Sequence, residues 1–488
     1  MLFNSFEFLV FLPIIFLLYW FVFCERRWQN MLVVVASYVF YGWWDWHFLL
    51  LIAITSLFSY GSGLLLEHFD GQRQKQKAIS ATNIILNLGI LGVFKYYNFF
   101  VENLEALFGI VGWHMDWVTM NIILPVGISF YTFQALSYTI DVYQKKLPAT
   151  HDIVEFFAYI SFFPQLVAGP IERATNLLPQ FQKERKFDYA KAADGCKQML
   201  WGFFKKMVIA DNCAVFVNQV WFGYQDETGF VLLISAILFT FQIYCDFSGY
   251  SDIAIGCARL FGFDLMDTFI FPYFSRSIPE FWRRWHISLT TWFRDYIYFP
   301  MGGSRCGKWQ IIRNVYIVWA ISGLWHGANW TFVCWGLYHG TLLAAYNLLG
   351  INTRYKHVVA YDHRLPNFRE LLQIVLTFFL VAIGLIIFRA NTMKDAIDYL
   401  SIVFSKSLFN ITGSLASFNG IELRYALPAL VLLILCEWCQ RDKRHALQFS
   451  GTNFMTRHVW FRYAIYTFLA TLTLGMAGSK SDFIYFQF

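Results

Sequence analysis

The sequence predicts an all-α polytopic membrane protein in which about 12 transmembrane helices are accompanied by re-entrant or interfacial segments. Of its 488 residues, 57% are hydrophobic and only 14% are charged, whereas a soluble globular chain carries about 25% charged residues. Apolar runs of membrane-spanning length also recur along the whole chain. A protein this apolar could not cover its surface with polar groups, so we expect lipid to be the solvent for much of it.

The predicted spans follow one another from one end of the sequence to the other. The first apolar run, residues 8–23, has the hydrophobicity of a signal peptide but lacks a basic start. Cys24-Glu25-Arg26-Arg27 follows it in place of a small-residue cleavage site, so we expect it to remain as a helix. The predicted spans are 6–24, 30–44, 48–66, 79–100, 117–140, 195–220, 229–248, 313–326, 330–349, 370–388, 424–438 and 459–476.

Two further apolar stretches are too short or too interrupted to cross a membrane. Residues 154–167 contain Pro164, and residues 249–263 contain Gly256. We expect both to form re-entrant or interfacial pieces, which survive in a membrane only where protein or a water-filled cavity covers their backbone.

The charged loops predict the orientation of the chain. Loops around Asp45, Glu102/Glu105 and Asp226/Glu227 alternate with basic loops, which the positive-inside rule places in the cytoplasm. Both termini are then extracytoplasmic. The basic loops contain Arg26/Arg27, Arg73/Lys75/Lys77, Lys145/Lys146, Lys183/Arg185/Lys186 and Arg441/Lys443/Arg444.

The loops leave no room for a second domain, so residues 1–488 are predicted to form one membrane domain. The longest cytoplasmic stretches, 144–194 and 264–312, are studded with aromatic residues and prolines, as expected of segments that lie on the membrane. The net charge of +6 is small and spread over short loops, which gives no support to nucleic-acid binding. The sequence shows no convincing internal repeat, which disfavours the inverted-repeat transporter folds.

The nine cysteines give no sign of a metal or redox site. Most lie in or beside apolar runs, where cysteine packs as a small hydrophobic residue. Cys436 and Cys439 form a lone C-x-x-C without a second pair or a nearby histidine, so a packing role is favoured and no metal is predicted.

Residues 277–298 predict an interfacial helix with a cationic side. Ser277 and Glu280 have the spacing of a capping box, and His286 lies at the centre of the segment. Alone, such a helix would serve as a membrane-surface anchor. Its apolar stripe is Phe281, Trp285, Leu289, Trp292 and Tyr296, and its candidate ligands for phosphates or lipid headgroups are Arg283, Arg284 and Arg294.

His326 is the residue to which the sequence most directly assigns chemistry. The apolar run from Arg313 to His326 is about 20 Å long as a helix, shorter than the roughly 30 Å hydrocarbon core, so His326 should stop within the membrane. Ionisable groups at that depth are costly and are candidates for function. Burial favours the neutral imidazole, which can accept a proton, and Gly323 and Gly327 would let a ligand or another backbone approach closely. A packing role is the alternative.

Four further polar residues are candidates near these histidines. If one helix ran through His326 and His339, the two would point to different faces, so His339 is predicted to be structural or supporting. Asp246 and Asp252 follow directly on an apolar span; they could line a polar path or fix a histidine tautomer, or they could cap the helix end. Asn329 is a candidate for substrate binding.

Six segments together resemble the membrane-bound O-acyltransferase family, most closely its bacterial alginate O-acetyltransferase branch. The resemblance extends from the first helix to about Gly340 and is weaker beyond it. As a set the motifs are highly specific, although Trp-His-Gly alone would be weak. The segments are LPVGISFY (124–131), SYTIDVY (137–143), FPQLVAGP (163–170), DFSGYSD (246–252), FWRRWHISL (281–289) and WHGANW (325–330).

The resemblance implies a ring of helices around a thinned centre with a tunnel. His326 matches the family's invariant histidine, and His286 matches its second position. A cytoplasmic thioester, acetyl-CoA or a derived acyl carrier, would supply an acetyl group, and the acceptor hydroxyl would approach from the outer face. No metal and no tightly bound cofactor are implied.

In this interpretation His326 acts as general base, which contributes roughly 10²–10⁴-fold. His286 orients it or stabilises the oxyanion, and the arginines of the interfacial helix suit the phosphates of the donor. The implied partners are membrane lipid, a periplasmic acetyltransferase-like protein and a polysaccharide synthase, and the implied location is the bacterial inner membrane.

Two alternatives stay open at this point. D-alanyl transfer to teichoic acid from a carrier protein would use the same tryptophan-flanked histidines. A non-catalytic transporter of polysaccharide or lipid-linked sugar would use the intramembrane polar residues as a pathway lining.

Overall fold

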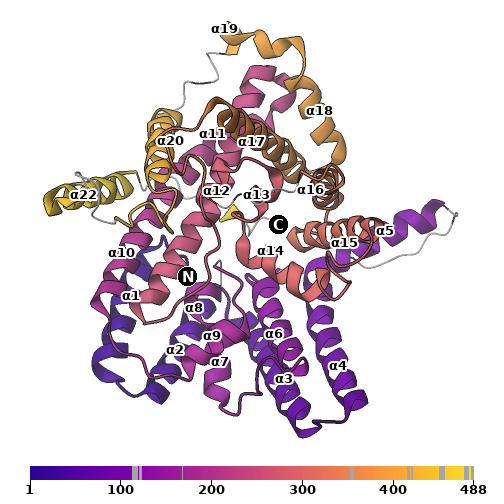
Figure 1. The fold of residues 1–488 in the computed structure, drawn as a ribbon, viewed down its shortest axis with the longest axis vertical. Coiled ribbons are helices and arrows are strands. Elements are labelled where there is room, and N and C mark those ends of the chain that lie inside the picture. The colour runs from indigo at the N-terminus through magenta and orange to yellow at the C-terminus, as the bar shows by residue number, and fades with distance from the viewer. Residues whose placement is uncertain are drawn as a thin grey trace. The chain divides into compact units, whose positions relative to one another are not determined.

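The computed structural model describes residues 1–110, 112, 119, 124–166, 169–351, 355, 357–414, 418, 421–449, 457–476, 483 and 484, and over these residues it contains helices and no strand (Figure 1). Four helical segments are long and apolar enough to cross a membrane: Trp46–His68, Arg73–Ile110, Gly229–Leu260 and Phe368–Arg389. The predicted all-α membrane fold is confirmed.

The chain forms two compact units that alternate in sequence. Unit 1 consists of Met1–Ala193 and Cys257–Met266, and unit 2 of Asp194–Gly256 and Asp267–Phe488. The prediction of a single domain over residues 1–488 stays a prediction. The helices of unit 1 are α1 (Phe6–Leu17), α2 (Arg26–Gly42), α3 (Leu49–His68), α4 (Arg73–Leu91), α5 (Tyr97–Ile110), α6 (Ile128–Tyr143), α7 (Ile153–Ser161), α8 (Phe163–Leu166) and α9 (Ala174–Phe181).

Unit 2 holds most of the remaining helices. Two helices, α10 (Tyr189–Phe203) and α12 (Gly229–Leu260), contribute residues to both units. The others are α11 (Asp211–Phe222), α13 (Ile278–Trp282), α14 (Ile287–Phe293), α15 (Lys308–His326), α16 (Trp330–Leu348), α17 (Phe368–Arg389), α18 (Met393–Val403), α19 (Ile411–Ser414), α20 (Ile421–Cys439) and α22 (Val459–Gly475).

Helix α6 is the centre of unit 1 and is buried along almost its whole length against α3 and α4. A polar contact joins it to α4, because the Thr139 hydroxyl donates to Oδ1 of Asn83 at 3.0 Å. The predicted span 117–140 is wrong over residues 124–127, since the helix begins at Ile128. Gly127 precedes it with φ of 75°, a left-handed conformation that suits glycine. Most of the earlier residues of that span lie outside the described part of the chain.

The first apolar run is helical as predicted, since α1 continues through a π-helical turn to Val22. Of the stretch 154–167, the described residues 154–166 belong to the short helices α7 and α8 and the residue between them, and neither helix has the length to cross a membrane.

Helix α12 corrects the prediction that residues 249–263 form a separate re-entrant piece. The helix runs without a break to Leu260. Gly249 and Gly256 are sites of close helix packing, because an added Cβ would lie 2.8 Å from Gly202 O and 2.4 Å from Gly195 O, respectively. These glycines permit the approach of the helix that contains residues 195–202, and they do not end α12.

Helices α15 and α16 form a tightly packed antiparallel pair in unit 2 (Figure 1). A Cβ at Gly323 would lie 2.3 Å from Phe332 O, and one at Gly336 would lie 2.1 Å from Trp319 O. The two backbones therefore touch where side chains would normally separate them. Helix α17 packs against α16 and completes the scaffold around the end of α15.

Candidate active site

His326 is the last residue of α15 and is buried. Gly327 leaves the helix in an extended conformation, and Asn329 begins α16 by accepting a hydrogen bond from the Thr331 backbone N–H at 3.0 Å. The chain therefore turns at His326, where the predicted span 313–326 ends. The helix begins earlier than predicted, at Lys308, and is 19 residues long, so the depth of His326 in the membrane stays a prediction.

Three aromatic rings hold the His326 imidazole edge to face. Ring centroids lie 4.9 Å from Trp325, 4.9 Å from Trp335 and 5.2 Å from Phe388. These rings come from α15, α16 and α17. Contacts of this kind contribute about 0.5–1.5 kcal/mol each beyond the area that they bury, so the ring has a defined orientation in an apolar surrounding.

The glycines beside His326 serve the fold and not an open approach for a ligand. An added Cβ at Gly327 would lie 2.2 Å from the Phe332 ring. The Phe332 carbonyl occupies the space that a Cβ at Gly323 would take. The sequence allowed either a ligand or another backbone to approach these glycines closely, and the structure shows that neighbouring protein groups do so.

The prediction of one helix over residues 277–298 is wrong, because the segment breaks at His286. The Ser277 hydroxyl caps α13 by accepting from the Glu280 backbone N–H at 3.3 Å, as predicted. His286 then adopts φ of 42° and ψ of 52°, and α14 begins after it. Tertiary hydrogen bonds cause the break: Ile270 N–H donates to Arg284 O at 3.0 Å, and Ile287 N–H donates to Thr268 O at 2.8 Å.

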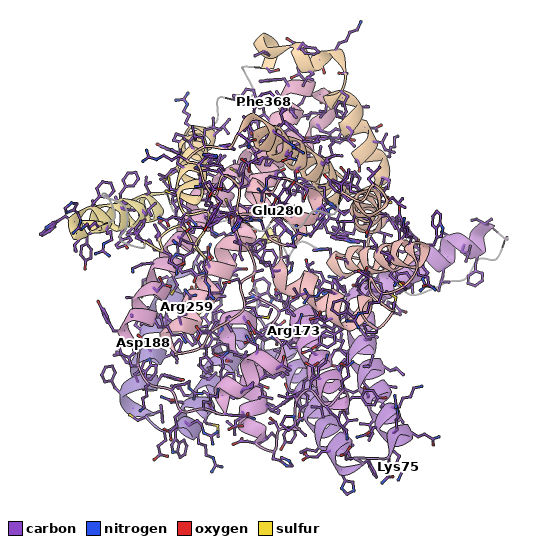
Figure 2. The ribbon with its side chains drawn as sticks, viewed as in Figure 1. Lys75, Arg173, Asp188, Arg259, Glu280 and Phe368 are labelled. Atoms are coloured by element: carbon purple, nitrogen blue, oxygen red, sulfur yellow. The ribbon has the colours of Figure 1, made fainter. Side chains whose placement is uncertain are left out.

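A buried ionic cluster secures the helix before this break. Glu280, whose position Figure 2 marks, receives hydrogen bonds from the Arg276 guanidinium and the Arg284 guanidinium, each at 3.1 Å, and from the Arg276 backbone N–H at 2.9 Å. Burial alone would raise the pKa of the Glu280 carboxyl, but the hydrogen bonds and charges of the two arginines outweigh burial and hold this pKa below its usual value. Glu280 therefore binds Arg276 and does not close the predicted reciprocal capping box.

His286 is as fully buried as any histidine in the described part of the chain. Its ring lies edge to face with Phe247 at 4.7 Å and near Trp325 at 5.9 Å. Segment 277–298 lies outside the four helices that can cross a membrane, and burial lowers the pKa of His286 to about 3. The imidazole is therefore neutral at physiological pH. No hydrogen-bond partner is found for its Nε2 among the described residues, while Nδ1 lies 3.5 Å from the Ser288 hydroxyl.

His286 and His326 line the same cavity, which has a volume of about 210 Å³. The cavity lies within unit 2, between the segment of α13 and α14 and the helix α15. Its walls are mainly aromatic and aliphatic, and the buried polar residues among them are His286, His326 and Ser322. The other lining residues are Trp282, Trp285, Leu289, Thr290, Phe293, Arg294, Tyr298, Val315, Val318, Trp319 and Leu343.

Of the three predicted arginines, only Arg294 lines this cavity. Arg294 is exposed and donates to the Asp295 carboxylate at 2.7 Å. Arg284 is engaged with Glu280, and its guanidinium also lies 3.4 Å from Ile270 O. Arg283 is exposed and does not line the cavity. Arg294 is therefore the cation that is best placed to meet a charged group at the cavity.

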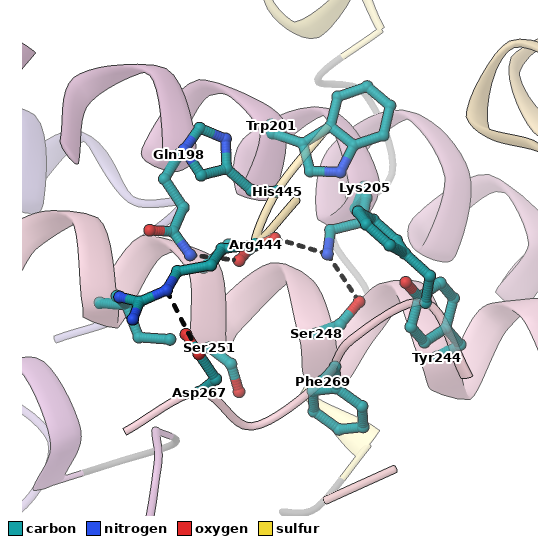
Figure 3. A pocket seen from close by; sticks show the side chains of 13 residues that line it. Gln198, Trp201, Lys205, Tyr244, Ser248, Ser251, Asp267, Phe269, Arg444 and His445 are labelled. Carbon is teal, nitrogen blue, oxygen red and sulfur yellow. Dashed lines mark hydrogen bonds and ion pairs between the residues drawn. The ribbon is translucent and has the colours of Figure 1, made fainter. Parts of the chain in front are cut away.

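Asp246 and Asp252 lie within α12 and pair with lysines, so they neither cap a helix end nor line the histidine cavity. Asp246 pairs with Lys206 at 2.7 Å, and Asp252 pairs with Lys205 at 2.6 Å. Lys205 and Asp252 both line a small polar pocket, where Lys205 also donates to the Ser248 hydroxyl at 2.8 Å (Figure 3).

The sequence interpretation missed these two lysines. They lie in the π-helical turn Phe204–Ala210 between α10 and α11 and are both buried. Two adjacent lysines inside the predicted span 195–220 were a usable signal, because cations at membrane depth require partners.

His339 and Asn329 have structural positions outside the cavity. His339 lies on α16, a different helix from His326, and its Nδ1 accepts from Trp282 Nε1 at 3.4 Å. Trp335 contacts both histidines. Asn329 caps α16 and donates from Nδ2 to Asn391 O at 2.9 Å.

Comparison with known proteins identifies the family of this chain. The sequence model of the membrane-bound O-acyltransferase family matches residues 38–383. The chain is 40% identical to the probable alginate O-acetylase of Pseudomonas aeruginosa over 89% of this chain and 81% of that protein.

Two further relatives are named for other activities. The chain is 31% identical to the peptidoglycan O-acetyltransferase of Helicobacter pylori over 100% of this chain and 98% of that protein. It is 29% identical to the teichoic acid D-alanyltransferase of Bacillus subtilis over 56% of this chain and 70% of that protein. The chain thus belongs to the membrane-bound O-acyltransferase family and is an O-acyltransferase.

Proposed function

We propose that this enzyme transfers an acetyl group from a cytoplasmic thioester, acetyl-CoA or a derived acyl carrier, to a hydroxyl of an extracytoplasmic polysaccharide or of a periplasmic partner protein. The observation that carries this proposal is the single cavity of about 210 Å³ that both His286 and His326 line. The relatives named as O-acetylating enzymes support acetyl as the group transferred.

His326 is proposed as the general base. It removes the proton of the acceptor hydroxyl as the oxygen attacks the thioester carbonyl, an ester bond forms, and the carbon–sulfur bond breaks to release the thiolate, which takes up a proton. A neutral imidazole is the form that this step requires. The edge-to-face packing of Trp325, Trp335 and Phe388 supports the role, because it holds the ring in one orientation.

His286 and Arg294 are proposed as the accompanying groups. His286 lines the cavity as a neutral imidazole, so one of its nitrogens can donate a hydrogen bond to the oxyanion or to His326. Arg294 lines the same cavity and suits a phosphate of the donor. Neither a metal nor a tightly bound cofactor is part of this proposal.

The setting proposed for the reaction is the bacterial inner membrane, with both termini extracytoplasmic and with a periplasmic acetyltransferase-like protein and a polysaccharide synthase as partners. Accessibility of terminal peptide tags to a protease in intact cells with a permeabilised outer membrane tests the orientation. Cleavage of either tag only after the inner membrane is opened would contradict it.

The proposal is tested with His326→Gln and His326→Ala in membranes supplied with labelled acetyl-CoA and the acceptor. We expect acetyl transfer to fall by roughly 10²–10⁴-fold, the contribution of a positioned general base. His339→Phe is the matched control, because His339 is also buried but lies outside the cavity. Full transfer by correctly folded His326 variants would refute the role of His326.

D-alanyl transfer is the alternative outcome of the same experiments. It predicts no turnover of acetyl-CoA, together with co-purification of a cytoplasmic acyl carrier. The similarity to the D-alanyltransferase covers 56% of this chain, whereas that to the acetylating relatives covers 89% and more.

A further inference from the structure

Residues 483 and 484 lie in the interior of unit 2, although the sequence separates them widely from both histidines. Phe483 and Ile484 are buried, with 0% and 2% of their surface exposed. The Ile484 backbone N–H donates to Oδ2 of Asp246 at 2.7 Å. The Phe483 ring packs against Tyr250 at 4.3 Å and Phe247 at 6.0 Å. One hydrogen bond and one aromatic cluster therefore fix this segment on α12.

Asp246 is a firm anchor for the segment. Its Oδ1 pairs with Lys206 Nζ at 2.7 Å, and the same lysine pairs with Asp211 at 2.8 Å. All three side chains are buried. A buried carboxylate that is held by a buried cation cannot turn away without leaving a charge uncompensated. Oδ2 is thereby kept in place to accept the charge-assisted bond from Ile484.

Phe247 connects this anchored segment to His286. Its ring lies 4.7 Å from the His286 imidazole at 89° and 6.0 Å from the Phe483 ring at 62°. His286 has only one polar contact within 3.5 Å at its ring, with Ser288, among the described residues. Its orientation therefore depends on the rings around it, of which Phe247 is the nearest.

We propose that residues 483 and 484 form a positioning element for His286: Asp246 anchors their main chain, and Phe483 holds Phe247 against the imidazole. Without the Phe483 ring, Phe247 gains room to turn, and the His286 ring loses the edge-to-face contact that orients it. The functional part of this inference rests on the proposed role of His286. The packing part is measured without any catalysis.

The packing is tested by the accessibility of His286 to diethyl pyrocarbonate in the full chain, with the modification at each histidine read by mass spectrometry. His339 is the internal reference, since both histidines are 1% exposed. In Phe483→Ala we expect the His286-to-His339 labelling ratio to rise about two- to twelvefold, the factor that corresponds to one aromatic pair.

Three further variants separate positioning from general destabilisation. Phe216→Ala removes another buried phenylalanine of unit 2, which stacks on Phe418, and should leave the ratio unchanged. Asp246→Ala should raise the ratio as Phe483→Ala does. Asp246→Asn keeps an oxygen that can accept from Ile484 and should raise it less.

The functional part is tested with a double-mutant cycle on acetyl transfer. Phe483→Ala should lower turnover in the wild-type background and cause no further loss in His286→Ala. An unchanged labelling ratio, an equal rise in Phe216→Ala, or a full additional loss of turnover in His286→Ala would overturn the inference. If His286→Ala transfers acetyl at the wild-type rate, the proposed catalytic role of His286 fails, while the labelling ratio still decides whether residues 483 and 484 position the ring.

Discussion

Substitution of Gly336 by alanine tests whether the contact between α15 and α16 sets the position of His326. The new Cβ would lie 2.1 Å from the carbonyl oxygen of Trp319, about 1 Å inside the 3.0 Å that is the practical minimum for a Cβ contact. The obstacle is backbone of the facing helix, so no side-chain rotation can relieve the clash. The two helices must move apart, and α15 carries His326 at its end.

The expected loss follows from two opposing effects. Alanine improves helix propensity by about 1 kcal/mol relative to glycine, whereas overpacking of a close contact costs up to about 3 kcal/mol. The net destabilisation should be up to about 2 kcal/mol. A shift of about 1 Å in a catalytic group costs on the order of 100-fold in rate, so turnover per folded molecule should fall more steeply than stability does.

The assay combines thermal unfolding of the detergent-solubilised protein with acetyl transfer by membranes. Gly89→Ala is the matched control, because a Cβ at this position in α4 would meet nothing within 4 Å and should leave stability equal or higher. A Gly336→Ala enzyme that unfolds at or above the wild-type temperature and keeps full turnover would refute the packing argument.

Three other perturbations test separate parts of the structure. Burial raises the pKa of Glu172 from its ordinary 4.5 to about 7. The stability linked to this carboxyl is therefore fully present below pH 4.5 and is lost as pH rises through about 7. The loss amounts to up to about 3 kcal/mol. Glu172→Gln should therefore be more stable than wild type above pH 7 in thermal-unfolding scans, and identical pH slopes of the two proteins would contradict this. Glu280→Ala leaves Arg276 and Arg284 without their shared carboxylate and should destabilise the protein by about 3 kcal/mol in denaturant titrations. Glu280→Gln keeps a hydrogen-bond acceptor and should lose less stability. Equal losses of stability in the two variants would show that the charge of Glu280 is unimportant. His339→Phe loses the hydrogen bond from Trp282 and should destabilise the protein by about 1–3 kcal/mol, while turnover per folded molecule persists. Loss of turnover at unchanged stability would instead indicate a catalytic role for His339.

The sequence by itself determined the membrane fold and the helix end at His326. Composition and the length of the apolar runs require a lipid environment, and both are properties of the chain before it folds. The short run that ends at His326, followed by Gly327, predicted a helix end there, and α15 ends at that residue. The Ser277 cap was also readable, because capping depends on residues within one turn.

Only the tertiary structure decided how the glycines, the aspartates and His286 are used. Gly249 and Gly256 interrupt helical propensity in the sequence, yet α12 continues through them because the facing backbone occupies the space that they leave. The helical pattern through His286 is overridden by backbone hydrogen bonds to Thr268 and Ile270.

The aspartates and the cavity depended on contacts between distant parts of the chain. Asp246 followed a predicted span as a candidate ligand, but its actual partners are Lys206 and the backbone of Ile484. His286 and His326 share a cavity only because the α13–α14 segment packs beside α15. The local sequence pattern determines the conformation that a segment prefers by itself. Whether a position becomes a helix break, a close packing site or a binding site is decided by the groups that long-range folding brings into contact with it.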